Sequence, residues 1–430
     1  MYAGLVVLLI SVAALTLYRR QSVMSAFLKR EMFVVELLFG TIMFASSYVE
    51  EEQQFWYWTA TSHFALAFIR RYLPIISVLT KPLEHFFINK STTHSYCSSI
   101  APPPYYSQVE PNRSSVPWQA DLGQKFAGAP DIVKDILQPN PSLLGLLVIA
   151  TYVLAGYNLY RYAFPRDDAF RRNVWPIVLV SVSILFKISM AAEAGERLPL
   201  WLQHIPYAWS SFASLVTKAR ISFVALSLGL LWFSYRWTTD LKKSQSWIEG
   251  AFTFLNLFLL GQSRYANIPL YLLFEAQRRL LELSDAGVDW LAVSCLWMQH
   301  VSFFALGNSN SLSSVDLTNA YNGITSYSIP FVGALTFISN WAGPIWWSMA
   351  AIRIYLGGST KDGKYADWMG WSSGFHGIAM LFLVGACIIL RTHLFIWTVF
   401  SPKFLFQVVW MVLQHIAIEG IVGSTLCWIS

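Results

Sequence analysis

The sequence predicts an all-α fold, a polytopic transmembrane bundle of about ten to twelve spans, on two observations. About 55% of the 430 residues are hydrophobic and 13% are charged, whereas about a quarter of the residues in soluble domains are charged. The apolar residues form runs separated by basic clusters such as Arg19-Arg20 and Arg70-Arg71. Short basic loops between apolar helices are typical of multi-pass membrane proteins, so the net charge of +6 does not indicate nucleic-acid binding.

Residues 1–71 form the first predicted region and contain three apolar runs. The runs lie at 3–18, about 32–48 and 55–69. The first run leads into Arg19-Arg20, which reverses the charge order of a signal peptide, so we interpret it as a span. The second run ends at three glutamates (50–52), so we expect a hairpin with an acidic tip on the luminal side. A span with its N-terminus outside the cytoplasm is an unusual start and suggests a missing upstream segment.

Residues 72–122 form the second region, which we expect to be an unstructured insertion. The segment contains Pro102-Pro103-Pro104, many Ser and Thr residues and no sustained periodicity. Loops of this length are uncommon and are usually functional or disordered. Asn89 and Asn112 lie in glycosylation sequons, which matter only if the segment faces the lumen.

Residues 123–430 form the third region, a transmembrane bundle. Its apolar runs lie at about 143–159, 173–191, 219–235, 248–261, 265–274, 288–306, 329–356, 370–390 and 404–429. Several runs are shorter than the roughly 20 residues of a full crossing, so half-helices or interfacial helices are alternatives. Basic residues flank both ends of the run at 143–159, which leaves the orientation of the middle spans open. The chain has no internal repeat that would favour an inverted-repeat transporter.

Ionisable residues inside apolar runs are candidate functional residues because burying them in a membrane is costly. Lys187 follows a dozen apolar residues, and Glu193, Glu196 and Arg197 follow it by about two to three helical turns. Lys187 could bind a carboxylate or a phosphate. The alternatives are a structural ion pair at the end of the span, or a lysine whose ammonium extends to the membrane surface. Glu275 lies late in its own run, where an interfacial position is the alternative.

Two polar segments supply the remaining candidates for lipid-headgroup contact or for polar packing inside the bundle. The segment 307–323 is rich in Asn, Ser and Thr, which bind sugar hydroxyls or phosphates but also form turns and helix caps. A basic and aromatic segment ending at Lys403 suits a headgroup interface. The candidates in these two segments are Asn308, Asn310, Asp316, Asn319, Arg391 and His393.

No motif in the chain assembles a recognisable catalytic centre. The sequence has no HExxH, GxSxG, P-loop or GxGxxG motif in a suitable context. It has no Asp/His clusters for a two-metal site, and its four cysteines lack metal-ligand spacing. We therefore assign no catalytic, cofactor-binding or metal-binding residue to this chain.

Five segments carry a resemblance to a known family. They are SSYVEEEQQFWYW (46–58), GQKFAGAPDI (123–132), SRYANIPLYLLFE (263–275), LGNSNSLSSVDLTNAYNG (306–323) and RTHLFIWTVFSPK (391–403). The last two are long and specific. With them, the chain resembles the C-terminal membrane region of the GPI ethanolamine phosphate transferases, and most of all the fungal type 2 members. The resemblance covers nearly the whole chain outside 72–122.

The resemblance implies a multi-pass transferase of the endoplasmic reticulum membrane. Such an enzyme moves phosphoethanolamine from phosphatidylethanolamine to a mannose of the GPI glycolipid, the second mannose for type 2. The family's chemistry resides in a luminal domain with a Thr nucleophile and two zinc ions, N-terminal to the membrane bundle. This chain begins after that domain, so zinc is expected only in the missing domain, and the chain alone is not expected to be catalytic. Its expected work is to bind and position the lipid substrates.

The resemblance also implies a partner, a small PIG-F type membrane subunit. Two alternatives remain open: a non-catalytic scaffold that binds this subunit, and a lipid or solute transporter with Lys187 and Glu275 lining a midplane site. In the family, a basic pair like Arg70-Arg71 leads quickly into the GQKFAGAPDI block. We therefore interpret residues 72–122 as a retained intron or gene-model artefact, which sequencing of the transcript through its 5′ end would test.

Overall fold

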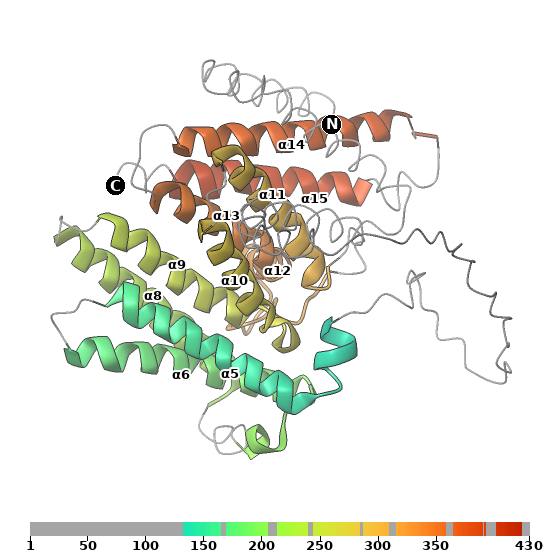
Figure 1. Ribbon diagram of the computed structural model, residues 1–430. Helices are drawn as coiled ribbons and strands as arrows, with labels where there is room; N and C mark the ends of the chain where they lie inside the picture. The colour runs from blue at the N-terminus through green and yellow to red at the C-terminus, as the bar shows by residue number, and fades with distance from the viewer. Residues whose placement is uncertain are drawn as a thin grey trace, which may run out of the picture. The chain divides into compact units, whose positions relative to one another are not determined.

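The computed structural model describes residues 132–164, 169–204, 213–239, 244–283, 287–308, 315–357, 364–389, 391–392 and 401–423. The predicted hairpin within 1–71 and the predicted insertion at 72–122 lie outside these residues. The described part of the chain contains helices, turns and irregular segments but no strand, which confirms the all-α class (Figure 1).

The first half of the described chain forms a group of helices that pack side by side. Its elements are the π-helical segments η2 (Ile132–Leu137) and η3 (Leu159–Ala163) and the α-helices α5 (Pro141–Asn158), α6 (Ala169–Glu193), α8 (Leu215–Thr239) and α9 (Ser244–Gln262). Helix α6 packs against α5 and α8, and α9 packs against α8 and η3. Figure 1 shows α5, α6, α8 and α9 lying together.

The second half is arranged around α13. Its elements are the 3₁₀ turn η4 (Tyr265–Asn267), the α-helices α10 (Leu270–Leu283), α11 (Val288–Ala305), α12 (Ile329–Asn340), α13 (Ala342–Gly357), α14 (Lys364–Ile389) and α15 (Ser401–Val412), and the π-helical segment η7 (Leu413–Gly423). Helix α13 contacts α9, α11 and α14. Its Trp346 is buried and packs on Phe252 of α9 and Phe274 of α10, with ring centroids 5.2 and 5.7 Å apart. The contact between Trp346 and Phe252 joins the two halves.

Helices α11 and α13 approach closely because a glycine lies between them. A Cβ added to Gly343 would lie 2.7 Å from both Cβ and Oγ of Ser302, closer than real side-chain atoms approach. Small residues at such crossings are characteristic of membrane bundles, where helix association depends on close packing. Gly343 therefore sets the α11–α13 distance.

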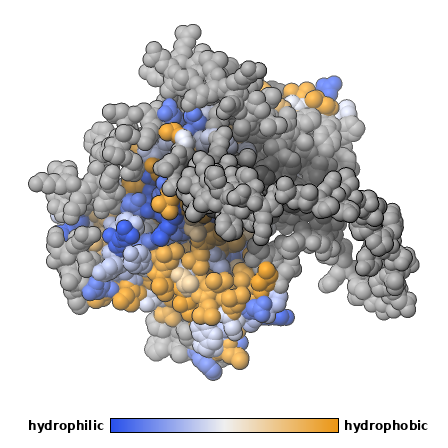
Figure 2. Space-filling model, viewed as in Figure 1, coloured by the Kyte–Doolittle hydropathy of each residue, from blue (hydrophilic) through white to orange (hydrophobic). Residues whose placement is uncertain are grey.

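Four stretches of the described chain are long and apolar enough to cross a membrane: Pro141–Ala163, Asn173–Glu193, Leu215–Arg236 and Asp367–Ile389. Only 22% of the apolar window in the third stretch is buried, so most of its side chains face outward. Figure 2 shows apolar side chains gathered where α5 runs in Figure 1. Outward-facing apolar helices are typical of membrane proteins, in agreement with the predicted transmembrane bundle; the number of crossings stays a prediction.

Two predicted runs differ from the helices that the structure shows. The run at 329–356 is two helices, because the chain turns at Trp341 between α12 and α13. The run at 265–274 begins as the short turn η4 and continues as α10 as far as Leu283. Helix α10 extends beyond the apolar run because charged residues spaced three and four apart form ion pairs along it.

Candidate functional site

Seven polar side chains from four separate segments form two hydrogen-bonded sets, one around Lys187 and one around Asp316. The backbone of the 315–328 segment joins the two sets, and together we call them the polar network. Helix α6 supplies one of them, the end of α9 and the residues after it supply two, the segment 315–328 supplies three, and the end of α12 supplies one. The members are Lys187, Gln262, Arg264, Asp316, Asn319, Asn322 and Asn340.

Lys187 lies at the centre of the polar network. Its side chain is 2% exposed, and its Nζ donates to Asn319 Oδ1 at 3.2 Å and to the Gly261 carbonyl at 3.4 Å. These acceptors are neutral oxygens. A buried ammonium is stable only when hydrogen-bonded or paired, and Lys187 meets this requirement through a long-range contact between α6 and the 315–328 segment.

Three buried amide side chains extend the hydrogen bonding from Lys187. Asn322 Nδ2 donates to Asn319 Oδ1 and to Gln262 Oε1, both at 3.3 Å. All three side chains are buried. The Nε2 of Gln262 and the hydroxyl of nearby Tyr265 are buried without a hydrogen-bond partner. Gln262, which is linked to Lys187 through Asn322 and Asn319, therefore keeps one unused donor.

The exposed edge of the polar network is an ion pair. Arg264 Nε donates to Asp316 Oδ2 at 2.8 Å, with the arginine side chain 48% exposed and the aspartate side chain 13% exposed. The other carboxylate oxygen of Asp316 accepts from the Thr318 backbone N–H and hydroxyl at 2.9 and 2.5 Å. Asp316 thus fixes both the arginine and the turn that follows.

Asn340 attaches the 315–328 segment to the helices. Its Oδ1 accepts from the Asp316 N–H at 2.8 Å, and its Nδ2 donates to the Asp316 carbonyl at 2.9 Å and to the Thr336 carbonyl at 2.8 Å. Asn308 Nδ2 in turn donates to the Asn340 carbonyl at 2.7 Å. One asparagine therefore pairs with both backbone groups of Asp316 and fixes its position.

The segment itself reverses direction at a glycine. Gly323 has φ of 78°, a left-handed conformation that residues with a Cβ rarely adopt. Its carbonyl accepts from Arg220 Nε of α8 at 2.8 Å. This contact ties the far end of the segment to the first half of the bundle.

Charges near the exposed edge act on one another. Burial is the largest effect on Glu196 and raises the pKa of its carboxyl, against the lowering by Lys187 and Arg264. Burial would also raise the pKa of Asp316, but hydrogen bonds from Arg264 and Thr318 hold it below its usual range. The hydrogen bond to Asp316 raises the pKa of Arg264. Asp316 is therefore the ionised carboxylate that pairs with Arg264.

The polar network combines two cations, one unused donor and a set of amides at the bundle end where α6, α9 and α12 terminate. Lysine and arginine bind phosphate oxygens, and asparagine and glutamine amides offer both donors and acceptors. These groups have the hydrogen-bonding capacity to hold a phosphate or a hydroxyl-rich group at the surface of an apolar bundle.

The structure brings together four of the residues singled out from the sequence: Lys187, Asp316 and Asn319 in the polar network and Asn308 beside it. Glu193, at the end of α6, and Arg391, after α14, are exposed, and the structure brings neither into the polar network. Asn310 and His393 lie outside the described residues.

Glu275 belongs to a different cluster. Its carboxylate accepts from Arg278 at 2.6 and 2.9 Å and from Arg279 at 3.0 Å, all within α10. Arg278 also pairs with Glu282, and the nearby Arg353 pairs with Glu249 of α9. Among the described contacts, none joins Glu275 to Lys187, so the structure does not assemble the midplane pair that the transporter alternative needs.

The sequence candidates omitted Gln262, Arg264, Asn322 and Asn340. Arg264 belongs to the block 263–275 that carried the family resemblance, and Asn322 belongs to the block 306–323. Gln262 and Asn340 each end a long apolar helix. The sequence did contain a signal for these two residues, because each is a polar residue at the end of an apolar run.

Comparison with known proteins gives one family. The chain matches the family model for the GPI ethanolamine phosphate transferase membrane region over residues 1–430. It is 31% identical to GPI ethanolamine phosphate transferase 2 of Yarrowia lipolytica over 97% of this chain and 51% of the relative. It is 32% identical to the Aspergillus fumigatus protein of the same name, over 90% and 40%, and 28% identical to that of Candida albicans, over 98% and 52%. The chain thus spans about half the length of these curated relatives or less. No solved structure matches the chain.

Proposed function

Because the chain belongs to the GPI ethanolamine phosphate transferase family and corresponds to its membrane region, we propose that it is the membrane part of a transferase in the endoplasmic reticulum. The reaction moves phosphoethanolamine from phosphatidylethanolamine to a mannose of the GPI glycolipid, the second mannose by its likeness to the type 2 relatives. The zinc-dependent chemistry belongs to a luminal domain outside this chain. A PIG-F type subunit is the proposed membrane partner.

The observation that carries the proposal is the convergence of Lys187, Arg264 and Asp316 with buried amides in one polar network. Three separate helices and one long connecting segment supply these groups. A membrane anchor does not require a buried lysine held by an asparagine 132 positions away. A fixed, buried positive charge suits a binding site for an anionic headgroup.

In this proposal the polar network holds a lipid-borne headgroup. Lys187 and Arg264 bind phosphate oxygens, while the amides of Asn319, Asn322 and Gln262 bind sugar hydroxyls. The apolar faces beside them accommodate the lipid chains. Holding a substrate in a reactive geometry can supply much of a rate enhancement without any catalytic residue in this part of the protein.

The test uses the full-length enzyme with Lys187→Met and Lys187→Arg. We expect Lys187→Met to raise the KM for the glycolipid about tenfold or more, the effect of losing a charged hydrogen bond, and Lys187→Arg to recover part of the loss. Lys218→Met is the matched control, because Lys218 is also buried but donates to Ser189 outside the polar network. An unchanged KM in folded Lys187→Met would remove the polar network from substrate binding.

A further inference from the structure

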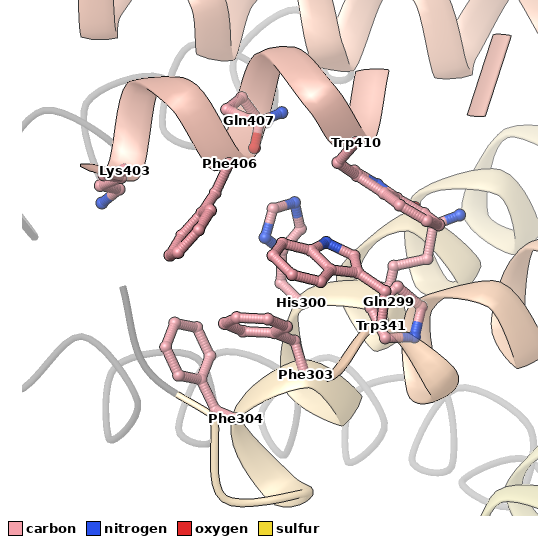
Figure 3. Close-up of a pocket in the computed structure, with 10 residues that line it drawn as sticks. Gln299, His300, Phe303, Phe304, Trp341, Lys403, Phe406, Gln407 and Trp410 are labelled. Carbon is pink, nitrogen blue, oxygen red and sulfur yellow. The ribbon is translucent and has the colours of Figure 1, made fainter. Parts of the chain in front are cut away.

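A second site lies beside the polar network, between α11 and α15. This headgroup pocket, as we call it, has an internal volume of about 40 Å³. Figure 3 shows residues of α15 facing residues of α11, with Trp341 between them. Helix α11 lines it with Gln299 and His300, and α15 lines it with Lys403 and Gln407.

One wall of the headgroup pocket is aromatic. Trp341 packs on Phe303 of α11 and on Phe406 of α15, with ring centroids 5.2 Å apart in both pairs. Phe304 and Trp410 extend this wall. An apolar wall of this kind suits the glycerol and upper acyl region of a lipid, and aromatic residues are enriched at that depth of a membrane.

The other wall carries amides without partners. Gln299 is 1% exposed, and neither its Nε2 nor its Oε1 has a hydrogen-bond partner. Gln407 is 6% exposed, and its Nε2 is also without a partner. Buried polar atoms are nearly always paired in proteins. Three unused atoms on the walls of one pocket therefore indicate a polar ligand, and the volume exceeds the roughly 10–15 Å³ that one water needs.

Lys403 adds a positive charge to the same pocket. It is 3% exposed and lies in the first turn of α15, where the helix dipole also favours an anion. His300 lines the pocket from α11. A lysine, a histidine and two amides together form a set of donors suited to phosphate oxygens.

The headgroup pocket adjoins the polar network through the backbone. Trp341, which lines the pocket, directly follows Asn340 of the polar network. Phe303, also in the lining, accepts a hydrogen bond at its carbonyl from Asn308, whose Nδ2 also donates to Asn340. The lining of the headgroup pocket is therefore continuous with the polar network at Asn340 and Trp341.

We propose that the headgroup pocket binds the phosphodiester of a diacyl phospholipid. Lys403 and the amide N–H groups of Gln299 and Gln407 donate to the phosphate oxygens, and the aromatic wall contacts the glycerol and acyl carbons. The role of this lipid as a reactant rests on the proposed function, whereas its binding does not. A membrane phospholipid and the inositol phospholipid end of a glycolipid share this chemistry, so the test separates them.

The first test uses purified full-length protein and lipid retention measured by native mass spectrometry. The probes are dioleoyl-phosphatidylethanolamine, dioleoyl-phosphatidylinositol and dioleoylglycerol, which lacks the phosphate. We expect at least one phospholipid to be retained about tenfold more than dioleoylglycerol, and the preferred one identifies the source. Equal retention of dioleoylglycerol would overturn the proposal without any variant.

Variants then assign the binding to the headgroup pocket. Gln299→Leu and Lys403→Met should each reduce phospholipid retention about fivefold to tenfold, and Lys403→Arg should restore most of it. Gln277→Leu is the matched control, because Gln277 of α10 also has a buried unpartnered amide oxygen but lies outside the pocket. Wild-type retention in both folded pocket variants would contradict the assignment.

If the pocket variants fail to fold, photo-crosslinking of the wild-type protein tests whether the phospholipid binds in the headgroup pocket. A phospholipid with a photoreactive acyl group should label the peptide that contains Phe406 and Trp410, and excess phospholipid should suppress the label. Labelling confined to other peptides would overturn the assignment. These readouts measure lipid binding alone. Binding can therefore be absent while the transferase reaction is confirmed, and binding can be present while the reaction is absent.

Discussion

Lys187 of α6 and Asn319 are 132 residues apart in the sequence, yet Lys187 Nζ and Asn319 Oδ1 lie 3.2 Å apart in the buried centre of the polar network. This contact joins an apolar helix to a segment whose composition alone suggested a turn. The segment does turn at Gly323, and its Asn319 accepts a hydrogen bond from the buried Lys187, while its binding of a headgroup stays a prediction. The site therefore depends on how the segment is anchored.

The first prediction concerns Asn340, which anchors the segment. Asn340→Ala removes three hydrogen bonds to backbone groups of Asp316 and Thr336 and leaves buried groups unpaired. We expect a loss of about 1–3 kcal/mol in stability, measured as a lower Tm of the purified protein. Asn140→Ala, which removes one exposed bond to the Ile136 carbonyl, should have little effect. Equal effects of the two substitutions would contradict the anchoring role.

The second prediction concerns the α11–α13 crossing. Gly343→Ala places a methyl group against Ser302, so the helices must separate or strain. Overpacking of this kind costs about 1–3 kcal/mol, again measured as a lower Tm. Gly333→Ala in α12 is the control, because no atom lies within 4 Å of the added Cβ. A Tm for Gly343→Ala at or above that of the control would show that the crossing is not tightly packed.

The third prediction concerns acid stability. The pKa of Asp316 is held below its usual range by Arg264 and Thr318. A depressed pKa contributes stability above the unfolded value, about 3.9, and this stability is lost as the pH falls through the folded value. We expect thermal stability to decline below about pH 4 less steeply in Asp316→Asn than in the wild type. An equally steep decline in both proteins would contradict a contribution of the ion pair to stability. The expected contribution is modest, because the Arg264 side chain is about half exposed.

The fourth prediction concerns Glu196, whose pKa is raised chiefly by burial. A carboxyl with a raised pKa in the folded state destabilises the protein as the pH rises above its unfolded value, about 4.3. Glu196→Gln should therefore raise the Tm at neutral pH and have little effect below about pH 4. A lower Tm at neutral pH would mean that attraction to Lys187 and Arg264 outweighs burial.

The sequence predicted the helices better than their ends. Apolar runs located α5, α6, α8, α9, α11 and α14, because an apolar run of this length in a multi-pass chain forms a helix whatever its neighbours. The sequence did not predict the turn at Trp341, because the segments before and after it are both apolar. The turn accompanies the hydrogen bonds between Asn340 and Asp316, which the sequence does not show. The extension of α10 was missed because ion pairs between Glu275, Arg278 and Glu282 replace apolar residues there.

The candidate site was predicted in its parts and not in its assembly. Lys187 could be identified because a charged residue inside an apolar run is unusual. Asp316 could be identified because it lies in a polar loop between two predicted spans. That Asn319 contacts Lys187, and that Gln262 and Asn340 complete the group, depends on which helix ends meet in space. Residue spacing along one helix carries no information on that.

The most direct test of the polar network is a double-mutant cycle in the full-length enzyme, with Lys187→Met and Asn319→Leu alone and together. The measured quantity is the KM for the GPI glycolipid, with Lys218→Met as the control. If the two side chains act as one binding group, the double variant should lose about as much as the worse single variant. KM values equal to that of Lys218→Met in all three variants would contradict the role of the polar network in holding substrate.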